Sequence, residues 1–191
     1  LALGVVEPWM CGLGGSGFLV CWDSSRKNGR VLDFQGVLPR GISLYDYPLD
    51  PGVPNTLMGF PGVRDGKNVR GYNSITVPGA VAGFGLALER FGTLAWDRVL
   101  LPTIELARLG LTADWHTTLH VALESPELAR DPEASRIYLP GGHAPFPEQN
   151  LKLGNLGRTL ETLAESGPDD FYRGELARKI TSDLARGGSC V

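Results

Sequence analysis

The sequence predicts an α/β fold of α+β character, built as a single domain over residues 1–191. Two short apolar segments near the N-terminus, separated by turn-forming residues, indicate a β-hairpin. Beyond residue 77, apolar side chains recur at the i, i+3, i+4, i+7 spacing of amphipathic helices. The 26 glycines and 14 prolines are typical of a loop-rich protein, not of a helical bundle. Early strands followed by several helices indicate a layered fold.

The first expected elements are the two strands of the hairpin, over residues 18–22 and 30–34. They follow an apolar segment at residues 1–6 and a glycine-rich stretch at residues 12–17. Asn28 and Gly29 are expected to supply the positive-φ residues of the connecting turn.

A long irregular excursion is expected between the hairpin and the first long helix, over residues 36–76. Excursions of this length without regular structure are usually lids, binding loops or mobile segments. Its prolines are Pro39, Pro48, Pro51, Pro54 and Pro61.

The second half of the chain predicts a series of amphipathic helices. One begins near Pro78 and ends at Gly92, and the next covers residues 95–109 with Gly110 as its stop. Thr112 is expected to cap a third helix that continues to about residue 123.

Residues 125–153 are again rich in proline and glycine. Two further helices are predicted after them. Asn155 is expected to cap the first, which ends at Gly167 and Pro168, and the second carries Leu176 to Leu184 and ends at Gly187.

Composition and charge exclude several function classes. The net charge of −3 and the lack of a basic run predict no nucleic-acid partner. No apolar stretch approaches the roughly 20 residues that span a bilayer. The chain begins inside an apolar segment without an initiator Met, and we expect it to be a fragment of a longer protein. Its three cysteines show no metal spacing and are interpreted as buried or free thiols.

Three local patterns near the N-terminus are candidate chemical sites. Gly12 to Gly17 form a G-x-G-x-x-G, but a dinucleotide loop follows a strand and opens a helix, whereas this one precedes a strand. Ser16 does not fit a G-x-S-x-G nucleophile elbow, and Cys11 has no His near it in sequence. The glycines are better interpreted as a tight approach to the hairpin strand.

His116 and His120 share a helix face, but zinc needs further ligands. Thr117 stands where the metalloprotease motif has Glu, and His143 is distant in sequence, so no metal site is predicted. From the residues alone, the chain shows no catalytic constellation.

Three blocks of the sequence together resemble the gamma-glutamyltransferase family of N-terminal-nucleophile hydrolases. Their order and gaps are compatible with that family, and the resemblance covers nearly the whole chain. The blocks are residues 4–18 with 31–34, residues 77–84 with 90–96 and 101–107, and residues 160–177 with Ile180, Gly187 and Gly188.

The resemblance implies an αββα sandwich of which this chain holds only the large-subunit portion. Such precursors cut themselves and expose a Thr that attacks a γ-glutamyl amide, as in glutathione. That Thr lies outside this chain, so no catalytic residue is expected here. The implied partners are the small-subunit segment of the same precursor and a small-molecule amide. No cofactor is implied, and the compartment, exported or cytoplasmic, is left open.

One residue departs from the family pattern. The family's Asp-Phe-Arg-Glu motif, whose Arg grips the substrate α-carboxylate, here reads Asp33, Phe34, Gln35, Gly36. Gln35 is therefore the candidate substrate-binding residue, but it carries no charge and cannot form a bidentate fork. Arg40 or Arg64 of the excursion is a candidate substitute for the missing cation.

Four interpretations follow. The leading one is a γ-glutamyltransferase-like enzyme. Gln35 gives weight to a related amidase or cephalosporin-acylase-like enzyme whose substrate lacks the glutamyl α-carboxylate. The remaining two are an uncleaved, inactive homologue that serves as a scaffold, and a nucleotide-binding module built on Gly12 to Gly17.

Overall fold

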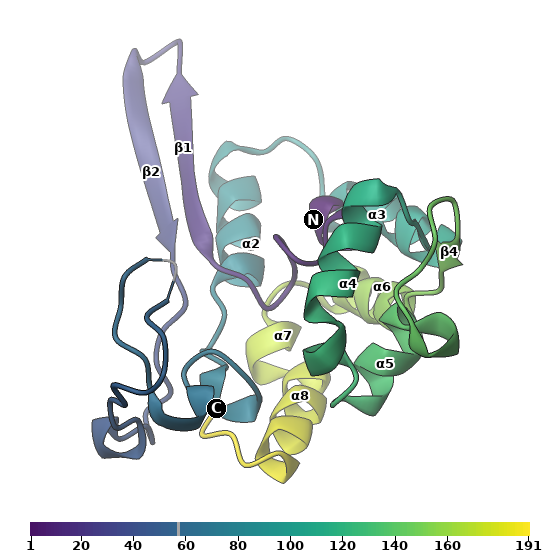
Figure 1. Ribbon diagram of the computed structural model, residues 1–191. Coiled ribbons are helices and arrows are strands. Elements are labelled where there is room, and N and C mark those ends of the chain that lie inside the picture. Colours follow the sequence, from purple (N-terminus) through teal and green to yellow (C-terminus); the bar gives the residue numbers. More distant parts are fainter. Residues whose placement is uncertain (57) are drawn as a thin grey trace.

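A computed structural model describes residues 1–56 and 58–191, so the part of the expected excursion at residue 57 lies outside the described residues. The fold is a mixed α/β arrangement, as the sequence predicted, with two small antiparallel sheets. A long hairpin projects beside helix α2, and the other helices form a body on one side of it (Figure 1). The strand β4 lies across that body from the hairpin, so the described residues alone do not stack two sheets on each other.

The elements follow in order along the chain. The strands are β1 (Gly17–Asp23), β2 (Asn28–Phe34), β3 (Leu111–Thr112) and β4 (Asn150–Leu151). The α-helices are α1 (Leu3–Val6), α2 (Ala80–Phe91), α3 (Trp96–Leu109), α4 (Trp115–Leu128), α5 (Pro132–Tyr138), α6 (Leu156–Ser166), α7 (Asp170–Arg173) and α8 (Glu175–Arg186). Short 3₁₀ turns lie at Leu44–Asp46, Arg64–Gly66, Tyr72–Ser74 and Pro140–Gly142.

The β1–β2 hairpin has the expected strands but a different turn. Asn28 and Gly29 are inside β2, opposite Asp23 and Trp22, so their assignment to the turn was wrong. The Asp23 carboxylate accepts from the backbone N–H groups of Ser25 at 2.9 Å and Arg26 at 3.1 Å. The Ser25 hydroxyl bond and the two backbone bonds lower the pKa of Asp23. This local capping places the turn at residues 24–27, before Asn28, and the residue with a positive φ is Lys27.

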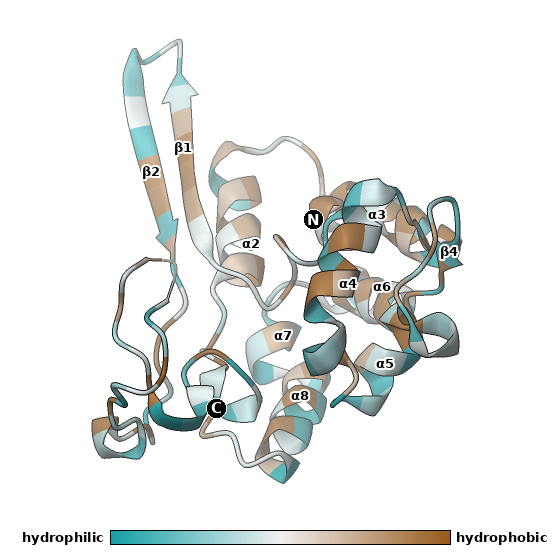
Figure 2. Cartoon of the chain, in the orientation of Figure 1, coloured by the Kyte–Doolittle hydropathy of each residue, from teal (hydrophilic) through white to brown (hydrophobic). Residues whose placement is uncertain are grey.

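The two faces of the hairpin have different surroundings. Leu32 is buried, and Leu19 and Cys21 line a cleft against Phe84 of α2. The opposite face carries large apolar side chains that are 61% to 77% exposed. The middle of both strands is coloured as hydrophobic in Figure 2. We call this exposed face the outer face of the hairpin, and its residues are Phe18, Val20, Trp22 and Val31.

Four of the predicted helices are confirmed with their glycine stops. Helix α2 ends before Gly92, α3 before Gly110 and α6 before Gly167, and α8 ends before Gly187. Gly110 and Gly167 adopt φ values of 94° and 82°, which a side chain would strain. Helix α2 begins two residues after Pro78, and the Asn155 side chain makes no cap bond although α6 begins directly after it.

Two expectations in the middle of the chain were wrong. Thr112 belongs to β3, and the residue that caps α4 is Asp114, whose Oδ1 accepts from the Thr117 N–H at 2.7 Å. Helix α4 then runs to Leu128, beyond the expected end near residue 123, and α5 lies in the region rich in proline and glycine. Asp131 caps α5 in the same way, accepting from the Ala134 N–H at 2.7 Å. A short aspartate-capped helix is easily missed where prolines dominate the pattern.

The main core lies between α3 and α6. The Trp96 Nε1 donates to the Leu163 carbonyl at 2.8 Å, and Arg108 pairs with Glu161 at 2.7 Å across the same two helices. A second cluster joins α2 to the C-terminal helices through Val81, Leu163, Phe171 and Leu176. The buried members of the main cluster are Val5, Leu100, Ile104, Ala107, Leu111, Leu151, Leu153 and Leu160.

Two isolated β-bridges brace the excursion between β2 and α2, and an ion pair at 2.8 Å from Arg70 to Glu127 joins it to α4. Val37 and Val77 exchange backbone hydrogen bonds at 3.0 and 2.9 Å where it leaves and rejoins the fold, and Leu49 bridges Val63 farther out. Among the described residues, no helix combines the length and apolar character that crossing a membrane requires.

Candidate functional site

Gln35 lies directly after β2, at the base of the hairpin, and its side chain is exposed. Its backbone N–H donates to Asp33 Oδ1 at 3.0 Å, which turns the chain away from the strand direction. Across the hairpin, the Ser16 hydroxyl donates to the Gln35 Oε1 at 3.3 Å. The register explains this contact, because Gly17 is paired with Phe34 and the flanking residues therefore face each other.

Glycines allow helix α2 to lie against the segment that carries Gln35. A Cβ atom on Gly79 would lie 2.1 Å from the Phe34 carbonyl oxygen and 2.9 Å from that of Gln35. One on Gly83 would lie 2.2 Å from Cγ of the Phe34 ring, and one on Gly36 would lie 2.7 Å from Oγ1 of Thr76. Only glycine fits such approaches, so the backbone at Gln35 is positioned by packing against α2.

The first turn of α2 gathers the three sequence blocks on which the resemblance depended. The Ala80 N–H donates to the Gly15 carbonyl at 3.0 Å, which joins the glycine-rich stretch to the helix. The Tyr172 hydroxyl donates to the Pro78 carbonyl at 2.9 Å and accepts from the Ala82 N–H at 3.1 Å. Burial raises the pKa of Tyr172 above its ordinary value.

The glycine-rich stretch is only partly a close-packed connection. A Cβ on Gly15 would lie 3.1 Å from the Gly12 carbonyl, and one on Gly17 would lie 3.1 Å from the Phe34 ring. Gly12 and Gly14 have open space where a Cβ would go. The stretch leads into β1 and supplies a carbonyl, not N–H groups, to the N-terminus of α2. This arrangement does not suit phosphate binding.

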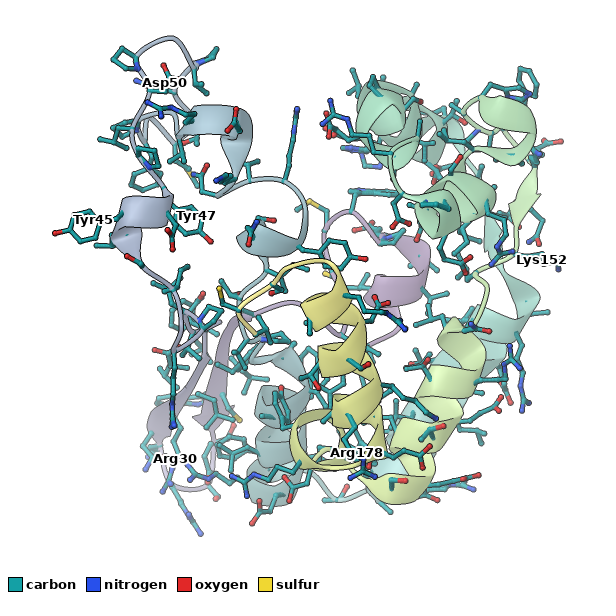
Figure 3. All side chains as sticks on the ribbon, turned by 90° about the horizontal axis from the view of Figure 1, so that it is seen from below. Arg30, Tyr45, Tyr47, Asp50, Lys152 and Arg178 are labelled. Atoms are coloured by element: carbon teal, nitrogen blue, oxygen red, sulfur yellow. The ribbon has the colours of Figure 1, made fainter. Side chains whose placement is uncertain are left out.

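The described part of the excursion does not place a cation against Gln35. Arg64 lies 3.9 Å from the Asp50 carboxylate, and Asp50 is on a lobe that extends away from the helices (Figure 3). Arg40 is exposed. Among the described residues, no hydrogen bond joins either arginine to Gln35. Asp33, two residues before Gln35, is the nearest charged residue in the sequence, and it is exposed.

His116 and His120 meet on α4, with 3.0 Å between their Nε2 atoms. Trp9 stacks on His120 with ring centroids 4.9 Å apart, an arrangement that the sequence did not suggest. Within the described residues, no group of three or more His, Cys, Asp or Glu is placed to hold a metal ion. His143 instead contacts the Ala144 carbonyl at 2.7 Å.

Cys11 is exposed and lines a small, largely apolar cavity of about 210 Å³ together with Leu13 and Thr103. Cys21 and Cys190 are likewise free thiols. The described hydrogen bonds include none between Cys11 and a His, so the cavity lacks a base to activate the thiol.

Sequence reasoning proposed Gln35 as a substrate-binding residue but did not predict its contact with Ser16. Ser16 is the non-glycine residue between Gly15 and Gly17, and this break in a run of glycines was the available signal. Tyr172 was quoted only as part of a motif, because no local pattern shows that its hydroxyl reaches a helix 90 residues earlier.

Comparisons with known proteins cover the whole chain. A family model described as gamma-glutamyltranspeptidase matches residues 1–191. The chain is 29% identical over its whole length to the glutathione hydrolase proenzyme of Escherichia coli (strain K12). It is 32% identical to the Acylase ACY 1 proenzyme of Pseudomonas sp. (strain SE83), again over its whole length.

A solved structure gives the same result for the fold. A gamma-glutamyltranspeptidase from Pseudomonas nitroreducens superposes with a TM-score of 0.82 at 25% identity, covering 100% of this chain and 52% of that one. The chain spans about a third of the length of the two curated relatives, 31% and 33%.

Proposed function

The chain belongs to the gamma-glutamyltranspeptidase family, and on that premise we propose that it is the large-subunit portion, as a single domain, of an amide-cleaving precursor. The complete precursor hydrolyses an amide-linked acyl group or transfers it to an amine, with γ-glutamyl compounds such as glutathione as the first substrate class. The single observation that carries the proposal is the convergence of the three family blocks beside Gln35, through the contacts of Gly15, Ala80 and Tyr172.

The nucleophile of this reaction is a Thr outside this chain, at the N-terminus of the small subunit after self-cleavage. Its hydroxyl oxygen attacks the amide carbonyl carbon while its own amine takes the hydroxyl proton. The leaving amine departs with a proton, and an acyl ester remains on the Thr. Water or an acceptor amine then attacks the ester and releases the acyl group.

The exposed apolar face of the hairpin supports the proposal that the small-subunit segment completes an αββα sandwich. A two-stranded hairpin is marginally stable alone, and its edges offer unpaired backbone groups. Its outer face exposes four large apolar side chains in this chain, Phe18, Val20, Trp22 and Val31. Covering that face with a second layer of structure buries this surface, which is the main driving force for such association.

Gln35 is proposed to contact the acyl group of the substrate. Its exposed amide is a neutral donor, whereas the family's Arg offers a charged fork. A charge-assisted hydrogen bond contributes roughly 1.5–3 kcal/mol against about 1 kcal/mol for a neutral one. The lack of charge weakens recognition of a glutamyl α-carboxylate by about tenfold.

This neutral donor favours a second candidate function, a related amidase or acylase whose substrate lacks the α-carboxylate. Asp33, next to Gln35 in the fold, adds a negative charge, and the described residues show no ion-pair partner for it. A panel that compares γ-glutamyl-anilide with acyl-anilides lacking the carboxylate separates the two functions. Strong preference for the glutamyl compound supports the first function and excludes the second.

Self-cleavage is the test of the enzymatic proposal as a whole. Denaturing gel electrophoresis of the complete gene product, followed by N-terminal sequencing of the fragments, is expected to give two pieces, the smaller beginning at Thr. A single uncut chain that hydrolyses none of the anilides would instead support the inactive homologue.

A further inference from the structure

The Gln35 side chain ends in an amide that has an acceptor oxygen, Oε1, and a donor NH₂ group, Nε2. The oxygen already has a hydrogen-bond partner. The carbonyl oxygen Oε1 accepts from the Ser16 hydroxyl at 3.3 Å. The backbone N–H of Gln35 is also engaged, with Asp33 at 3.0 Å. Among the hydrogen bonds of the described residues, none uses the side-chain Nε2 of Gln35.

An amide whose oxygen is already bonded presents its NH₂ group to whatever approaches next. A free glutamine side chain samples many rotamers and both amide orientations, so a ligand that needs the NH₂ group must first order it. A hydroxyl that holds Oε1 removes part of this ordering cost before the ligand arrives. Ser16 is suitably placed because the Gly17–Phe34 pairing fixes the distance between the two backbones.

We propose that Ser16 is a positioning residue for Gln35, and that its hydroxyl orients the Gln35 amide so that Nε2 donates to an oxygen atom of the acyl group. This inference rests on the proposed function, in which Gln35 contacts the substrate. It adds a second residue to that subsite and defines the group it recognises, a hydrogen-bond acceptor oxygen.

A positioning role for Ser16 and a purely structural role differ in their expected effects on KM and kcat. Ser16→Ala leaves the Nε2 donor in place but unoriented, so it is expected to raise KM for the preferred anilide by about two- to fivefold and to leave kcat nearly unchanged. Ser16→Thr keeps the hydroxyl and is expected to restore most of the wild-type KM. Ser24→Ala, an exposed position in the turn of the same hairpin, is the matched control and is expected to change neither value.

A double-mutant cycle with Gln35→Ala tests whether the two residues act together. If Ser16 acts through Gln35, the Ser16→Ala change has no further effect on KM once Gln35 is alanine. The inference is overturned if Ser16→Ala leaves KM unchanged, or raises it equally in both backgrounds.

All of these measurements use the complete precursor, and its self-cleavage is followed in parallel so that a misfolded variant is recognised. A wild-type precursor that cleaves itself but acts on none of the anilides would overturn the proposed function together with this inference. A wild type that acts on them, with an uncoupled Ser16, overturns this inference alone.

Discussion

The hydroxyl of Tyr172 donates to the Pro78 carbonyl at 2.9 Å and so ties the C-terminal helices to the start of α2. The same oxygen accepts from the Ala82 N–H at 3.1 Å, which satisfies one of the N–H groups that the first turn of a helix leaves free. One side chain thus fixes the helix that packs against the backbone of Gln35.

Tyr172→Phe is expected to lower the free energy of unfolding by about 1–2 kcal/mol, because it removes the partly buried bond to the Pro78 carbonyl and the exposed bond from the Ala82 N–H while keeping the ring. Chemical denaturation of the complete precursor measures this. Tyr45→Phe is the matched control, since Tyr45 is 95% exposed. Equal midpoints for the two variants would show that the Tyr172 hydroxyl contributes nothing.

Gly83→Ala is expected to destabilise the protein by about 1–3 kcal/mol, because the new methyl group would lie 2.2 Å from Cγ of the Phe34 ring and would force α2 and β2 apart. Gly29→Ala, in β2, is the control, since its nearest contact would be an ordinary 3.8 Å to the Trp22 ring. Unfolding midpoints of both variants check the prediction, and a neutral Gly83→Ala would contradict the close packing described for α2.

The cap of α4 predicts a pH dependence. The backbone N–H bond from Thr117, the largest cause, lowers the pKa of Asp114 below its ordinary value. A carboxyl group whose pKa is lowered by folding stabilises the fold above its unfolded pKa of about 3.9, and this stabilisation is lost as the pH falls through the lower folded value. Asp114→Asn keeps a capping oxygen without the charge. Wild type is therefore expected to have the higher denaturation midpoint near pH 6 and to lose that advantage below about pH 4. A constant difference at both pH values would contradict this assignment.

A charged substitution on the outer face of the hairpin is expected to impair assembly of the complete precursor. Val20 is 77% exposed in this chain, so Val20→Asp is expected to cost the chain little by itself. In the complete precursor the same change would place a charge in the proposed interface between sandwich layers, and the yield of the self-cleaved pair is expected to fall by at least tenfold. Ser24→Asp, in the turn of the hairpin, is the control. An unchanged yield of cleaved pair from Val20→Asp would show that the outer face stays in solvent.

Much of the fold could be predicted from the sequence because its signals are local. The apolar stripes and the glycines at positions 92, 110, 167 and 187 defined four helices with their ends. The errors came from aspartates that bond to nearby backbone. Asp23 moved the hairpin turn away from Asn28 and Gly29, and Asp114 replaced Thr112 as a cap. Such side-chain bonds compete on nearly equal terms, so composition alone does not decide between them.

The site was predictable only in part. The position of Gln35 followed from a motif, but its contact with Ser16 depends on the strand register, which the misplaced turn residues obscured. The role of Tyr172 depends on packing between segments 90 residues apart, which no local pattern encodes.

The central claim is that Gln35 contacts the acyl group of the substrate, and Gln35→Arg tests it most directly. The measurement is the ratio of kcat/KM for γ-glutamyl-anilide to kcat/KM for an acyl-anilide without the α-carboxylate, in the wild-type and Gln35→Arg precursors. Because the guanidinium restores a charged, bidentate partner for the carboxylate, the ratio is expected to rise by about tenfold. An identical ratio in the two self-cleaved proteins would contradict the claim and show that residue 35 does not contact the substrate.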